Sequence, residues 1–198
     1  MPDSRNVAAL RLSPELLNRA RGGDRAGFAQ LVELYYPRAL RFAQSMLGDQ
    51  RDAEEAVQDT FVRVHSNLAR FEGDALFDPW FFRILGNRCR SLITKRQRHH
   101  AVIEYPAVLP DFISETDHAP PDDEFIRHVH RALADLPADQ REAFLLRYVN
   151  DLDYDEMTIV TGARVGTLRM RVKRALDALR IKLRVEPPVQ LHDGAAHE

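Results

Sequence analysis

Cationic side chains gather near the C-terminal end of the sequence, on a segment whose apolar residues recur at helical spacing. Between Ala163 and Arg184, eight Lys/Arg stand against one Asp/Glu. A helix fits the major groove of DNA, where arginine and lysine reach base edges and phosphates. Suitable donors occur at Arg164, Thr167, Arg169, Arg171, Lys173 and Arg174. This segment predicts duplex DNA recognition, and its charge alone also permits a solvated basic helix at the end of a bundle.

The residues that precede this segment favour the DNA interpretation. A short helix is predicted from Tyr154 to Val160, followed by a tight turn over 161–163 and a long helix over 164–184. Two helices joined by such a turn are typical of a helix-turn-helix domain. In the long helix, the apolar positions that should face inward are Val165, Leu168, Val172, Leu176, Leu179 and Leu183.

Aromatic residues interleaved with arginines form a second candidate site. The aromatic residues Phe71, Phe77, Trp80, Phe81 and Phe82 lie around a loop that contains Gly73, within a basic stretch from Phe61 to His100. Unpaired bases stack on aromatic rings at about 1–3 kcal/mol each, while cations hold the phosphates. The pattern predicts binding of single-stranded nucleic acid. The alternative is that the rings form the core, which is favoured for Phe81 and Phe82.

An acidic face is predicted on the helix that begins near Asp49. Asp52, Glu55 and Asp59 fall opposite the apolar stripe of this helix and are expected to lie in solvent. Because an acidic face cannot bind DNA, a basic protein partner is a reasonable hypothesis. Simple solvation, with acids favoured near a helix start, is the alternative.

The sequence divides at an acidic segment rich in proline. Between Ala101 and Ile126 there are seven acidic residues and no Lys/Arg, together with Pro106, Pro110, Pro120 and Pro121. We therefore expect an all-α fold of two small helical domains, residues 13–100 and 122–184, joined by a flexible acidic linker over 101–121. Residues 185–198 are expected to be a disordered tail.

Several classes of protein are excluded by composition. No apolar run is long enough to span a membrane, no signal core begins the sequence, and Cys89 is the single cysteine, which together predict a cytoplasmic protein without disulfides. Cys89 itself is expected to be a buried thiol. There is no phosphate-cradling glycine motif, and the spacing of His99, His100, His128 and His130 fits no recognised zinc or di-iron site. No enzymatic activity, cofactor or metal is predicted.

From Leu16 to Arg184 the sequence resembles the extracytoplasmic-function (ECF) group of sigma factors in the sigma-70 family. Residues 52–61, DAEEAVQDTF, are similar to that family's polymerase-binding helix, which docks on the clamp helices of the largest subunit of RNA polymerase. The resemblance implies core polymerase as a partner. The contact residues that it implies are Asp52, Glu55, Gln58 and Asp59.

Two further motifs carry the resemblance. Residues 71–80, FEGDALFDPW, are similar to the loop that captures a flipped base of the minus-ten non-template strand, and 82–88 to the helix that supports it. The implied minus-ten residues are Phe71, Gly73, Asp74, Phe77, Trp80, Arg83, Asn87 and Arg88. Residues 136–137, 154–157 and 165–175 resemble the family's domain that recognises the duplex minus-thirty-five element. The implied minus-thirty-five residues are Arg164, Thr167, Arg169, Arg171, Lys173 and Arg174.

The resemblance implies an alternative sigma factor that directs promoter-specific initiation. Residues 13–100 would be sigma region 2 and residues 122–184 region 4. An anti-sigma factor is an expected partner, and the free protein is expected to be a monomer. The rival interpretation is a free-standing helix-turn-helix regulator, which would require a dimer and palindromic sites.

Overall fold

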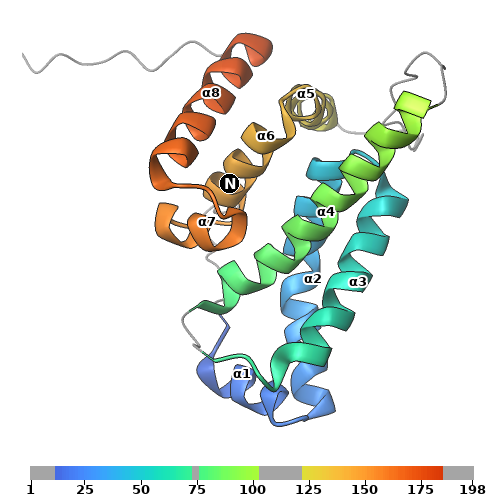
Figure 1. Cartoon of the computed structure of the whole chain (residues 1–198), viewed down its shortest axis with the longest axis vertical. Helices are drawn as coiled ribbons and strands as arrows, with labels where there is room; N and C mark the ends of the chain where they lie inside the picture. Colours follow the sequence, from blue (N-terminus) through green and yellow to red (C-terminus); the bar gives the residue numbers. More distant parts are fainter. Residues whose placement is uncertain (1–11, 73–75, 103–121, 185–198) are drawn as a thin grey trace, which may run out of the picture.

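The computed structural model describes residues 12–72, 76–102 and 122–184, and every regular element in these ranges is helical (Figure 1). The elements are α1 (Pro14–Arg21), α2 (Arg25–Leu47), α3 (Gln50–Leu68), α4 (Phe77–Val102), α5 (Asp122–Ala134), α6 (Ala138–Phe144), η2 (Leu145–Val149), α7 (Tyr154–Thr161) and α8 (Val165–Leu183). The prediction of two all-helical domains is confirmed. Gly73, Asp74, most of the predicted linker and the predicted tail lie outside the described residues.

The first domain contains α1–α4, and its long helices begin and end at residues that suit those positions. The side chain of Asp24 accepts from the Ala26 amide at the start of α2, and that of Asp49 accepts from the Asp52 amide at the start of α3. Gly48 ends α2 at a φ of 68°, a conformation that glycine adopts without strain. Between these caps, α2 continues through Pro37, although a proline within a helical pattern predicts a break or a kink.

The continuity of α2 has a packing explanation. Tyr35 and Ala39 on either side of the proline are fully buried, whereas Pro37 itself is exposed. Burial of the neighbouring turns offsets the one backbone hydrogen bond that proline cannot donate.

The start of α4 also differs from expectation. Asp78 followed by Pro79 predicts a helix that Asp78 caps, but α4 begins one residue earlier, at Phe77. The Asp78 carboxylate instead accepts hydrogen bonds from the Tyr35 hydroxyl and from Arg38, whose Nη2 lies 3.0 Å away. A carboxylate with two side-chain partners on α2 is tied to tertiary structure rather than to its own helix end.

The second domain is a helix-turn-helix unit supported by α5 and α6. The sequence after Pro137 predicts a single helix over 138–148, but α6 changes after Phe144 into the wider η2 turn. The amide Nδ2 of Asn150 donates to the Leu145 carbonyl at 3.1 Å at the end of this turn. Asp153 and Glu156 then form a capping box at the start of α7, and Gly162 ends α7 with a φ of 72°. This left-handed residue makes the tight turn into α8.

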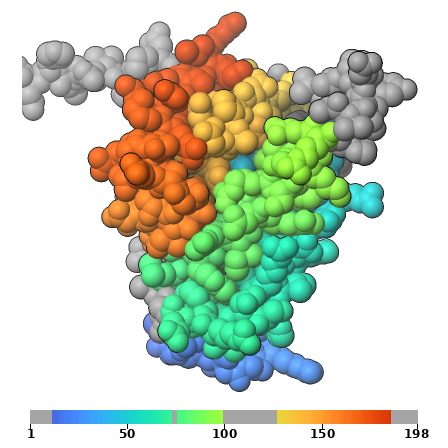
Figure 2. Space-filling model, in the orientation of Figure 1, coloured from blue at the N-terminus to red at the C-terminus, as the bar shows by residue number. Residues whose placement is uncertain are grey.

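The two domains pack directly against each other. In Figure 1, α7 lies beside the N-terminal half of α4, and Figure 2 shows the surface of the second domain in contact with the α4 surface. Arg141 on α6 donates to the Met46 carbonyl at the end of α2 at 2.7 Å. Arg38 on α2 donates to the Asn150 carbonyl at 3.3 Å. Polar contacts therefore connect the domains in addition to apolar packing.

Candidate nucleic-acid interface

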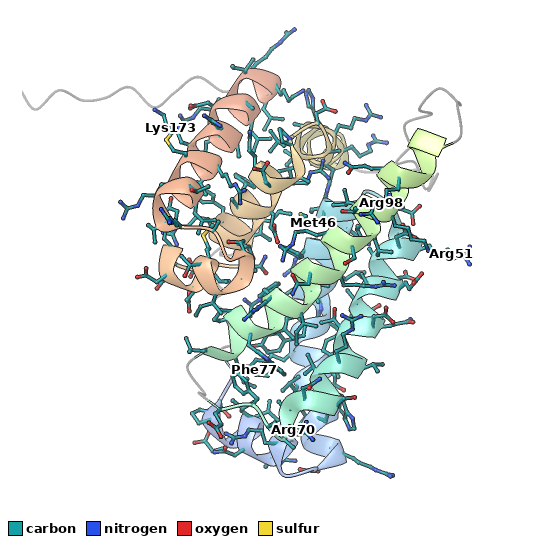
Figure 3. The ribbon with its side chains drawn as sticks, in the orientation of Figure 1. Met46, Arg51, Arg70, Phe77, Arg98 and Lys173 are labelled. Carbon is teal, nitrogen blue, oxygen red and sulfur yellow. The ribbon has the colours of Figure 1, made fainter. Side chains whose placement is uncertain are left out.

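The outward face of α8 carries most of the predicted duplex-binding residues. Of the six residues predicted to face inward, Leu168, Val172 and Leu179 are buried and Val165, Leu176 and Leu183 are half-buried. Ala175 is buried beside them. The opposite face exposes the side chains of Arg164, Thr167, Arg169, Lys173 and Arg174. Figure 3 shows Lys173 on the outer side of α8, away from the first domain. Five of the six predicted donors thus lie on an accessible basic face.

Arg171 occupies a different position. It lies at the edge of the exposed face, with 28% of its side chain accessible, and its Nε forms an ion pair with the Asp139 carboxylate of α6 at 3.0 Å. Arg169 also has an intramolecular partner, since its guanidinium lies 5.4 Å from the ring centroid of Tyr154 on α7. Both contacts fix the orientation of α8 on its own domain.

The aromatic cluster of the first domain is largely internal. Phe71 and Phe77 are buried, as are Phe81 and Phe82, so none of these four rings presents a face to an unpaired base in this conformation. The core interpretation is therefore correct for Phe81 and Phe82, and it also describes Phe71 and Phe77. Trp80 is half-buried, with its ring centroid 4.6 Å from that of Phe71 and 5.5 Å from that of Phe77.

Trp80 borders an open hollow of about 360 Å³ that includes residues from both domains. Leu76 and Phe71 contribute from the loop before α4, and Ile159 contributes from α7. Helix α7 of the second domain therefore lies close to Trp80, the half-buried aromatic residue of the cluster.

The acidic face of α3 is paired with arginines of α4. Nη2 of Arg88 lies 2.8 Å from a carboxylate oxygen of Glu55, and its Nε lies 2.8 Å from one of Asp59. The face is accessible to solvent, as expected, since 56% of the Glu55 side chain and 43% of the Asp59 side chain are exposed. In addition, α4 packs antiparallel beside α3 and pairs these carboxylates with its own cations. Asp52 is likewise paired, with Arg96. Gln58, Arg83 and Asn87 are exposed.

Comparison with known proteins identifies the two domains. Residues 31–99 match the model of sigma-70 region 2, and residues 126–179 match the model of sigma-70 region 4. The chain belongs to the ECF group of the sigma-70 family. Members of this family direct promoter recognition by RNA polymerase and are not enzymes.

Individual relatives of this sigma factor cover nearly its whole described length. It is 30% identical to the RNA polymerase sigma-H factor of Pseudomonas aeruginosa, over 83% of this chain and 90% of that protein. Identity to the ECF sigma factor SigW of Bacillus subtilis is 25%, over 85% and 95% of the two chains. Among solved structures, the sigma factor RpoE of Bartonella quintana, in complex with the anti-sigma factor NepR, aligns with a TM-score of 0.66 at 30% identity, over 81% and 98%.

Region 2 and region 4 of this sigma factor meet at an ion pair between Arg90 and Glu142. Considered alone, the sequence of α4 predicts Arg90 on its outer face, but the Arg90 guanidinium pairs with the Glu142 carboxylate of α6, and only 4% of the Glu142 side chain is exposed. The expectation is wrong because it considered one helix in isolation. Gly86 permits this approach, since a Cβ atom there would lie 2.8 Å from Oε1 of Glu142. Burial raises the pKa of Glu142, and the nearby Arg90 opposes that rise.

Cys89 lies next to this ion pair and is fully buried, as expected. Burial, with a smaller contribution from the Glu142 charge, raises the pKa of its thiol to about 12. A thiol in this state is protonated and unreactive at neutral pH. Within the described ranges, no helix combines the length and hydropathy needed to cross a bilayer.

Proposed function

We propose that this sigma factor binds core RNA polymerase in the cytoplasm, reads the minus-thirty-five element as duplex through α8, and holds the melted non-template strand of the minus-ten element through region 2. The observation that carries the proposal is the exposed basic face of α8, which follows a helix-turn-helix bend. Phosphates bind Lys173 and Arg174 by charge, while donors near the start of α8, Arg164 and Thr167, reach base edges.

Region 2 supplies the single-strand site of the proposal. Trp80 is the aromatic residue with accessible surface in the cluster, and Phe71 and Phe77 pack beneath its ring. A base pulled from the duplex can stack on such a supported ring. Arg83 and Asn87 are exposed on the same helix and would donate to phosphates and bases. Phe71 and Phe77, which are buried against Trp80, would position its ring.

Polymerase binding is assigned to the acidic face of α3. Asp52, Glu55, Gln58 and Asp59 would contact basic groups on the clamp helices of the largest polymerase subunit. Arg88 already forms ion pairs with Glu55 and Asp59. Docking on polymerase would therefore replace Arg88 by cations of the clamp helices as the partners of these carboxylates. This exchange releases Arg88 for the minus-ten DNA, which links polymerase binding to the completion of the DNA site.

Promoter binding also requires the two regions to separate. The minus-ten and minus-thirty-five elements are named for their positions relative to the transcription start, so they lie about 25 base pairs apart. At about 3.4 Å per base pair, this is a separation of about 85 Å. Helix α8 spans about 28 Å at 1.5 Å per residue and follows α7, which lies against α4. The packed arrangement therefore cannot reach both elements, and α7 must leave α4 when the promoter is bound.

An anti-sigma factor is a further proposed partner. The Bartonella quintana sigma factor that shares this fold at 30% identity was solved with its anti-sigma factor NepR. A partner of that class would bind this chain across both regions and keep it from core polymerase.

The decisive experiment combines the full chain with core polymerase of its own organism. Co-elution of the two on gel filtration, followed by initiation at a start site that core alone ignores, is the expected result. Glu55→Arg should abolish co-elution, and the exposed Arg25→Glu on α2 serves as a charge-changing control. Operator binding by a dimer of the free chain, with no association with core, would instead establish the free-standing regulator and refute the proposal.

A further inference from the structure

An apolar side chain stands in the middle of the basic face of α8. Met170 is 48% exposed. At 100° per residue, Met170 lies 200° around the helix from both Leu168 and Val172, which are buried at 0% and 3% exposure. Met170 therefore points almost directly away from the domain. Arg171, one residue further, has already turned toward the domain edge and pairs with Asp139.

The neighbours of Met170 on this face leave it unobstructed. Gly166, one turn before it, adds no side chain, and a Cβ atom built there would meet nothing within 4 Å. Lys173, three residues after it, is exposed and points outward in Figure 3. Whatever the outer face of α8 approaches will meet the methionine thioether and methyl group at its centre, with cations on both sides.

From this arrangement we propose that Met170 is a specificity residue of the minus-thirty-five site and contacts the methyl group of a thymine. The inference rests on the proposed function, and it adds the base that this position selects. The major-groove edges of unmodified DNA offer one apolar group, the C5 methyl of thymine. A methionine side chain makes no directional hydrogen bond that would select another base, and its flexible chain adapts to a methyl group.

Replacement of thymine by uracil tests this contact, because it removes the methyl group and leaves base pairing unchanged. The holoenzyme, made from the full chain and core polymerase, first selects duplexes from a library randomised across the minus-thirty-five window. Each thymine of the selected site is then replaced singly by uracil. We expect one position to lose affinity by about fourfold, equivalent to about 0.8 kcal/mol for one buried methyl group.

Holoenzyme that carries Met170→Ala should bind the thymine and uracil forms of that duplex equally. When this variant holoenzyme selects duplexes from the same library, it should show no base preference at that position. Ile181→Ala is the matched control: Ile181 is an apolar residue of the same helix, 80% exposed near its C-terminal end, and its loss should change neither result. Uracil tolerance at every thymine, or equal uracil sensitivity in Met170→Ala, overturns the inference while the sigma-factor function stands. Failure of the holoenzyme to select any sequence overturns the proposed function, and the inference with it.

Discussion

Removal of the Arg90 guanidinium should loosen the packing of region 4 on region 2. Glu142 is 4% exposed in its side chain, so Arg90→Ala leaves a carboxylate buried without its cation. Loss of one partner from a fully buried pair costs about 3–5 kcal/mol. Because Arg90 is 34% exposed, water can reach the carboxylate, and we expect about 2 kcal/mol. This energy corresponds to about a 30-fold shift from packed to separated protein.

Fluorescence energy transfer between dyes at Ser66→Cys on α3 and Lys173→Cys on α8 measures this equilibrium, since the buried Cys89 is not labelled. If the packed state is favoured 100:1 in the parent, Arg90→Ala should leave about a quarter of the molecules open and lower the transfer efficiency accordingly. Adding Glu142→Gln to Arg90→Ala should restore much of the signal, because an amide carries no charge to bury. Arg83→Ala, an exposed cation on the same helix, should have no effect.

Acid should diminish the effect of Arg90→Ala. Burial raises the pKa of Glu142 above the value that this carboxyl has in the unfolded chain. The protonated Glu142 side chain therefore favours the folded, packed state. This stabilisation is complete below the unfolded pKa and is lost as pH rises through the folded pKa. The difference between Arg90→Ala and the parent should therefore shrink from pH 7.5 toward pH 5. Equal transfer efficiencies for the variant and the parent at pH 7.5, or the same loss in Arg83→Ala, would refute the reasoning.

Three further predictions follow from contacts made by single side chains. Arg141→Ala removes a guanidinium that donates to the carbonyls of Met46, Ala134 and Leu136, and should lower the free energy of unfolding by about 2–3 kcal/mol in urea titrations, whereas the exposed Arg131→Ala should not. Arg88→Ala should strengthen binding of core polymerase without DNA by up to about fivefold, because it frees two carboxylates from a partly exposed pair; weaker binding would show that Arg88 itself supports docking. Cys89 should resist iodoacetamide at pH 8 in the native protein and react fully in guanidinium, and rapid native modification would contradict its burial.

The elements of this fold were predictable where local chemistry determines them. Asp49 begins α3 and Gly48 ends α2 because a capping carboxylate and a left-handed glycine act within one helical turn of their own position. The turn at Gly162 and the inward stripe of α8 were predictable for the same reason. These local signals, with the charge pattern, were sufficient to predict two helical domains and a helix-turn-helix bend.

The partners of individual side chains came only from the tertiary structure. Helical periodicity places Arg88 and Arg90 on α4 but does not say which helix packs there, and the structure pairs one with α3 and the other with α6. Phe71 and Phe77 have the composition of a base-stacking site, yet the tertiary structure buries both rings and packs them against each other. A sequence determines helix ends and faces through neighbours a few residues away, whereas an ion pair between residues 52 positions apart exists only once two packed domains bring them together.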